Sequence, residues 1–219
     1  MYNDIITLVF EKYIDDEFTY EQANELLVSL HNKYFDDYTL EGANRDYLKA
    51  FKTANKKFKE SVKKLKKIAA SGNPDAEEEF YDEMKNANKA LDDGLAEISE
   101  IPSTVASSIL SFIILDFIQF VKWLLPTILT LGIAQIVKFF QNLIVLLRGI
   151  GKGIRNEEDW VEALNMVRQK YSQTCEYNRR ILSKLEERYK KNKQKKLASI
   201  EKKAEKAAKK ENKKSDTEE

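Results

Sequence analysis

Cysteine, histidine, proline and glycine are all scarce in this 219-residue chain, which has one Cys, one His, three Pro and seven Gly. A single Cys excludes a disulfide framework, and one Cys with one His excludes the usual zinc clusters. So few Pro and Gly residues cannot form the many turns of a β-sandwich or a β-barrel, so long helices are expected. The composition therefore predicts an all-α protein without a bound metal.

Sequence motifs of common enzyme classes are missing as well. The chain has no GxSxG nucleophile motif, no GxxxxGK[ST] phosphate-binding loop and no HExxH zinc motif. The glycines from Gly149 to Gly153 do not form a phosphate loop, because no strand precedes them and the full spacing is absent. We therefore predict a protein that is not an enzyme and that uses no cofactor.

Charge is segregated along the chain, although 37 Lys and Arg nearly cancel 36 Asp and Glu. Residues 1–46 contain eleven acidic and three basic residues, and residues 47–68 contain nine lysines and one acidic residue. Residues 75–100 are acidic again, and residues 188–214 contain thirteen basic and three acidic residues. Neighbouring blocks of opposite charge favour pairing between successive helices, so only the last block is a candidate for an unpaired basic arm.

The spacing of apolar residues predicts successive long helical hairpins with coiled-coil-like arms. Residues 1–38 are expected to form a short helical hairpin. Residues 39–101 are expected to form a longer charged hairpin that folds back at Gly72, with its basic helix antiparallel to its acidic helix. Residues 156–190 are expected to form one long amphipathic helix. The Lys-rich tail of residues 191–219 is predicted to be either a solvated helix or disordered.

The region of residues 102–148 is the most apolar part of the chain, and Pro126 divides it into two runs of similar length. Each run is long enough to cross a hydrocarbon core of ~30 Å, whereas one helix through both would be too long. We therefore predict a central apolar helical hairpin that bends at Pro126. A single helix kinked at Pro126 is the alternative, because no polar loop separates the two runs.

Two opposite charges lie at similar distances from the predicted bend. Asp116 is ten residues before Pro126, and Lys138 is twelve residues after it. An unpaired charge in a membrane or in a protein core is costly, so we predict an ion pair between Asp116 and Lys138.

Two further features follow the apolar region. Gly149, Gly151 and Gly153 predict a flexible hinge over residues 149–155. The tail contains a dense cluster of lysines that is a candidate contact for nucleic-acid phosphates or for an anionic lipid surface. These lysines are Lys190, Lys191, Lys193, Lys195 and Lys196. Arg is rare there and aromatic residues are not interleaved, which argues against base-specific recognition.

The sequence leaves two functions open. In the first, the chain is a membrane-associated interaction or assembly protein, with the apolar hairpin inserted in or lying on a bilayer and both termini cytoplasmic. Insertion is marginal for each run, because about −4 to −8 kcal/mol from apolar residues is offset by about +3 for a central charge. In the second, it is a soluble structural protein of a viral particle, located in the virion or the cytoplasm, with the apolar region as subunit core. Both functions predict a homo-oligomer or a helical protein partner.

Overall fold

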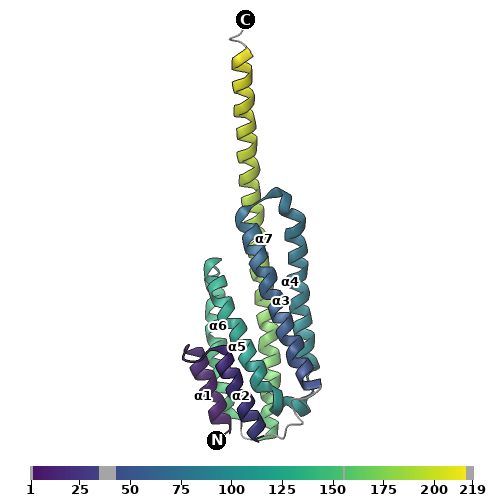
Figure 1. The fold of residues 1–219 in the computed structure, drawn as a ribbon, viewed down its shortest axis with the longest axis vertical. Coiled ribbons are helices and arrows are strands. Elements are labelled where there is room, and N and C mark those ends of the chain that lie inside the picture. Colours follow the sequence, from purple (N-terminus) through teal and green to yellow (C-terminus); the bar gives the residue numbers. More distant parts are fainter. Residues whose placement is uncertain (1, 35–42, 155, 216–219) are drawn as a thin grey trace.

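The structure is a computed structural model that describes residues 2–34, 43–154 and 156–215. The described residues form seven α-helices and no strand, which confirms the all-α prediction (Figure 1). The coiled-coil-like arms stay a prediction. In chain order the helices are α1 (Tyr2–Ile14), α2 (Tyr20–Tyr34), α3 (Ala43–Ser71), α4 (Glu77–Glu100), α5 (Ala106–Thr130), α6 (Ala134–Gly153) and α7 (Glu157–Ser215).

Helices α1 and α2 form a short hairpin whose second helix begins with a capping box. The Thr19 backbone N–H donates to the Gln22 side chain (2.9 Å), and the Gln22 backbone N–H donates back to the Thr19 hydroxyl (3.2 Å). These two bonds satisfy backbone donors that the first turn of a helix leaves without partners. The apolar face of α1, which includes Val9 and Phe10, is buried, so the hairpin is held by its packing on α5 and α6.

Helices α3 and α4 form a longer hairpin that turns at Gly72, where the backbone φ is +56°. A Cβ atom at this position would lie 2.5 Å from the backbone carbonyl carbon of Asn192 on α7, so only glycine fits. The basic α3 and the acidic α4 lie side by side (Figure 1). The ammonium group of Lys64 on α3 is 2.6 Å from the carboxylate of Glu83 on α4, in agreement with the expected pairing of opposite blocks.

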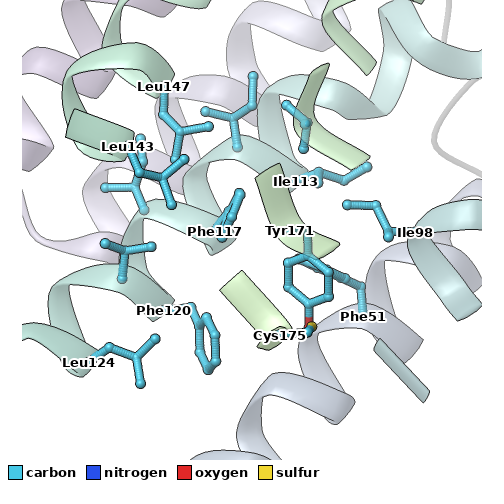
Figure 2. Packing of buried hydrophobic residues seen from close by; sticks show 14 of the residues in the cluster. Phe51, Ile98, Ile113, Phe117, Phe120, Leu124, Leu143, Leu147, Tyr171 and Cys175 are labelled. Carbon is cyan, nitrogen blue, oxygen red and sulfur yellow. The ribbon is translucent and has the colours of Figure 1, made fainter. Parts of the chain in front are cut away.

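Helix α5 is the centre of the core. It contacts α1, α2, α3, α6 and α7, and its residues from Ser108 to Ile118 are all buried. The Phe117 ring packs edge-on against Tyr171 of α7, with 5.4 Å between the ring centroids. Both residues belong to the buried cluster drawn in Figure 2. The Phe120 ring packs against Phe58 of α3 at 5.7 Å. The apolar side chains of α5 are therefore buried by protein on nearly every side.

The bend predicted at Pro126 is wrong, because α5 continues through this residue to Thr130. The chain reverses instead at Gly132, which has a φ of +70°. The Leu131 backbone N–H donates to the carbonyls of Thr127 and Ile128, both at 3.2 Å, and so closes the last turn of α5. A proline near the end of a helix removes one hydrogen bond, whereas a left-handed glycine ends the helix.

The hinge predicted at Gly149, Gly151 and Gly153 is also wrong, because all three lie within α6. The break between α6 and α7 falls at Ile154 and Asn156 instead. Each glycine costs a helix about 1 kcal/mol relative to alanine. Burial of Leu147, Ile150 and Ile154 offsets this cost and keeps the segment helical.

Helix α7 is one continuous helix of 59 residues, so no boundary exists at residue 190. Its first part is buried against the other helices through a seam that includes Leu164, Tyr171, Leu185 and Tyr189. Its last part extends beyond all other helices to Ser215 (Figure 1). The tail as far as Ser215 is thus a helix rather than disordered.

Candidate functional site

Asp116 lies in the apolar centre of α5 with only 4 % of its surface exposed. Its Oδ1 accepts a hydrogen bond from the Tyr20 hydroxyl of α2, and its Oδ2 is 3.6 Å from the Lys52 ammonium of α3. Lys138 is exposed on α6, so the predicted Asp116–Lys138 ion pair is wrong. The reason is the position of the turn: Asp116 is sixteen residues before Gly132 and Lys138 only six after it, so they lie at different levels.

A cavity of about 260 Å³ opens beside Asp116, and we call it the α2–α3–α5 cavity after the helices that surround it. Residues with polar groups line it from all three helices, although α5 is otherwise the most apolar helix of the protein. The lining residues are Tyr20 of α2, Lys52, Asn55, Lys56 and Lys59 of α3, and Asp116 and Gln119 of α5.

Burial dominates the electrostatics of this cavity. It raises the pKa of Asp116 to about 6, although the Lys52 ammonium and the Tyr20 hydrogen bond act in the opposite direction. Burial also lowers the pKa of Lys59, whose ammonium lies 5.8 Å from the centre of the Phe120 ring. For Tyr20, burial and the Asp116 carboxylate both raise the pKa, so its hydroxyl remains a donor at neutral pH.

Two buried polar atoms of the cavity lining have no hydrogen-bond partner among the described residues. They are Oδ2 of Asp116 and Nδ2 of Asn55, which is 5 % exposed. The other side-chain atom of Asn55, Oδ1, accepts a hydrogen bond of 2.8 Å from the Tyr171 hydroxyl. Oδ2 keeps its ion pair with Lys52 at 3.6 Å. A buried acceptor and a buried donor without hydrogen bonds nevertheless usually mark bound water or a ligand, since a missing hydrogen bond is costly there.

Three of the five predicted tail lysines are paired with nearby side chains of the bundle. Lys190 is 2.7 Å from Glu186, Lys193 is 2.6 Å from Glu77, and Lys196 donates to the Asn73 side chain at 3.2 Å. Lys191 and Lys195 are exposed.

The predicted cluster therefore straddles the point where α7 leaves the bundle, and the freely exposed basic surface lies further along the helix. Four exposed lysines lie close together on this part of α7, beginning with one of the predicted cluster. They are Lys195, Lys202, Lys203 and Lys206.

His31 and Cys175 are both buried, which makes them packing residues. The His31 ring lies edge-on to Phe112 at 6.0 Å, and burial lowers the pKa of the imidazole. Burial raises the pKa of the Cys175 thiol to about 12, so the thiol remains protonated and unreactive at neutral pH.

Sequence reasoning missed two basic residues that bind backbone carbonyls. Lys122 of α5 donates to the Tyr13 carbonyl at 2.8 Å and is 2.5 Å from the Asp16 carboxylate. Arg168 of α7 donates to the carbonyls of Ile98 (3.1 Å) and Ile101, at the end of α4. The presence of Lys122 within an apolar run was a usable signal, because a charge there needs a partner.

Comparisons of this chain with models of protein families, with curated proteins and with solved structures found no match. Among the described residues, one helical segment, Ser103–Thr130, is long and apolar enough to cross a membrane. In this structure 78 % of its most apolar window is buried by the rest of the protein. The core helix of a soluble protein meets the same criterion, so this segment leaves the localisation open.

Proposed function

We propose that this protein is a non-enzymatic structural protein that uses the end of α7 to bind a polyanion, such as the nucleic acid packaged in a viral particle. The observation that carries the proposal is the continuation of α7 beyond the bundle as a strongly basic helix (Figure 1). Residues 194–215, which we call the α7 extension, contain nine lysines and three glutamates. At 1.5 Å per residue the α7 extension is about 33 Å long.

The composition of the α7 extension favours phosphate contact without sequence recognition. All described side chains from residue 194 to residue 206 are exposed, so their ammonium groups are available to a partner, apart from that of Lys196, which donates to Asn73. Lysines that neutralise phosphates release condensed counterions, and this release supplies most of non-specific binding. The segment has neither arginine nor aromatic residues, which would be needed for bidentate base contacts or for base stacking.

The burial of α5 supports its role as a subunit core. Insertion of the α5–α6 hairpin into a bilayer would require α5 to leave α1, α2, α3 and α7, and would separate Asp116 from both Tyr20 and Lys52. Charged helices surround α5, and burial of an apolar helix by amphipathic neighbours is the usual arrangement in water.

The test is binding of a 30-base-pair duplex of random sequence at several salt concentrations, followed by fluorescence anisotropy. Replacing Lys195, Lys202, Lys203 and Lys206 by Gln should weaken binding at least tenfold. It should also reduce the slope of log affinity against log salt concentration by about 3 to 4, because each phosphate contact contributes ~0.9 to that slope. The matched control removes four exposed lysines of α3: Lys49, Lys57, Lys63 and Lys67. Equal losses in the two variants would overturn the proposal, since net charge alone would then explain binding.

Membrane association is the second candidate function, and one further observation favours it. The hairpin of α5 and α6 exposes large apolar side chains, with Leu129 63 % and Val145 68 % exposed. If this hairpin inserts, the protein will float with zwitterionic vesicles and resist extraction by high salt and carbonate. Flotation that requires anionic lipid and disappears at high salt would instead assign lipid contact to the basic α7 extension.

A further inference from the structure

The α2–α3–α5 cavity has features of a ligand site that are separate from polyanion binding by the α7 extension. Asp116 and Asn55 are both more than nine-tenths buried, and each contributes an atom without a hydrogen-bond partner among the described residues. One atom is an acceptor and the other is a donor. An occupant that satisfies both must therefore carry a hydrogen-bond donor and a hydrogen-bond acceptor.

The charge of the lining favours an anion. Lys52, Lys56 and Lys59 lie on successive turns of α3 and border the cavity, whereas Asp116 is its one carboxylate. Lys56 is 4.0 Å from Glu60, but that glutamate does not line the cavity. Like charges on successive turns of a helix repel one another, and a bound anion removes this repulsion.

We propose that the α2–α3–α5 cavity binds a small hydroxylated anion, such as a phosphate monoester of a polyol. The anionic group is held by the ammonium groups of Lys52, Lys56 and Lys59 and accepts a hydrogen bond from Asn55 Nδ2. A hydroxyl group of the ligand donates to Asp116 Oδ2.

The volume of about 260 Å³ restricts the size of this ligand. It lies just below the range of about 300 to 1,000 Å³ that is typical of small-molecule pockets, so the ligand has few non-hydrogen atoms. Neutral polyols lack the charge that the lysines select, and sulfate, a simple inorganic dianion, lacks the hydroxyl donor that Asp116 selects.

Calorimetric titration at constant ionic strength tests the proposal with three probes: glycerol 3-phosphate, sulfate and glycerol. We expect saturable binding of glycerol 3-phosphate at least fivefold tighter than that of sulfate, and no binding of glycerol. If none of the three probes binds at 10 mM, the cavity holds water alone and the proposal is wrong.

Two variant pairs distinguish a built site from general attraction to a basic surface. Replacing Lys52 and Lys56 by Gln should weaken glycerol 3-phosphate binding at least tenfold. The matched control, Lys63 and Lys67 replaced by Gln, removes the same charge from exposed positions of α3 and should change binding less than twofold. Equal losses in the two variants would overturn the proposal.

Asp116→Asn tests the role of the carboxylate. Amide substitution removes the negative charge and weakens the acceptor for the ligand hydroxyl, so the preference for glycerol 3-phosphate over sulfate should fall toward one. Thermal unfolding of each variant without ligand serves as the folding control. An unchanged preference in folded Asp116→Asn would show that Asp116 does not contact the ligand. Because the probes are small, these results are independent of the outcome with duplex DNA.

Discussion

Helices α5 and α6 come from two apolar runs of similar length, yet they occupy different environments. Phe117 at the centre of α5 is 0 % exposed, whereas Val145 in the second half of α6 is 68 % exposed. Helix α5 is enclosed by five other helices, and α6 packs chiefly against α1 and α5. Apolar content alone therefore does not determine how deeply a helix is buried.

The positions of the polar residues explain the difference. On α6, Lys138, Gln141 and Asn142 are all exposed and define a solvent-facing side. On α5 the polar residues are buried and find internal partners: the Ser108 hydroxyl donates to the Val105 carbonyl at 2.8 Å, and Asp116 accepts from Tyr20. A helix can be buried all round only when each of its polar groups has a partner in the core.

The largest effect should come from removing a ring from the enclosed helix. Phe117→Ala should lower the free energy of unfolding by about 3 to 5 kcal/mol, since it leaves a cavity among α5 and α7 side chains. Val145→Ala should change it by less than about 0.5 kcal/mol, because the side chain is exposed. Urea denaturation followed by circular dichroism measures both values. Equal losses would show that α6 is buried as deeply as α5, through contacts with another molecule.

The charged residues of α5 and α6 should give the next largest difference in their effect on the free energy of unfolding. The folded pKa of Asp116 is about 6 and its ordinary value is 3.8, so the ionised form costs stability. The protonated carboxyl therefore contributes stability that is fully present below about pH 4 and is lost as the pH rises through 6. Asp116→Asn should therefore raise the free energy of unfolding at pH 7.5 by about 1 to 3 kcal/mol, at 1.36 kcal/mol per pKa unit.

Urea denaturation of Asp116→Asn between pH 4 and pH 7.5 should show a flatter pH dependence than that of the original protein. Lys138→Gln is the control on α6, and its stability should follow that of the original protein within about 0.5 kcal/mol at every pH. If Asp116→Asn is less stable at pH 7.5, the charged interaction with Lys52 outweighs the cost of burial.

Substitutions near the turn that joins α5 and α6 should change the free energy of unfolding less. Gly132→Ala should cost about 1 to 2 kcal/mol, since an L-residue is strained at a φ of +70°, although nothing lies within 4 Å of the added Cβ. Pro126→Ala restores a backbone N–H inside α5 and should be neutral or stabilising by up to about 1 kcal/mol. Thermal unfolding compares the two variants. A larger loss of stability for Pro126→Ala than for Gly132→Ala would show that the chain turns at Pro126.

The smallest effect concerns the ion pair that ties α6 to the turn after α1. Arg148 lies 2.7 Å from Asp15, with both side chains partly exposed. A double-mutant cycle with Arg148→Ala and Asp15→Ala should give a coupling energy of about 0.2 to 1 kcal/mol that decreases in 1 M NaCl. The cycle of Lys138→Ala with Asp15→Ala should give none. A coupling energy well above 1 kcal/mol would mean that charge, rather than apolar packing, holds α6.

Local sequence signals predicted where helices lie better than they predicted which residues of different helices are in contact. Gly72 lies at the turn that the sequence predicted for the hairpin of residues 39–101, because a glycine signal of this kind acts over a few residues. Gly132 was also a usable signal, since a glycine after a helix commonly adopts the left-handed conformation. The prediction of a bend at Pro126 placed the turn six residues too early, and this displacement also gave the wrong partner for Asp116.

The α2–α3–α5 cavity could not be predicted from the sequence. Tyr20 is 96 residues from Asp116 in the chain, and nine lysines of residues 47–68 were equally eligible as its cationic partner. Which lysine approaches Asp116 depends on how α3 packs against α5, and local spacing does not contain that information. The helical glycines of α6 show the same limit, because the distant contacts that bury Ile150 and Ile154 override local propensity.

Because α7 is one unbroken helix, a force applied to the α7 extension reaches the bundle directly. A partner that pulls on the α7 extension transmits the force along one helix to the seam that α7 shares with α3, α4 and α5. Pulling along the helix axis loads this seam in shear, so its contacts resist together, whereas a sideways pull would peel them apart one turn at a time. The Gly72 turn, whose backbone meets Asn192 where α7 leaves the bundle, would bear the sideways load first.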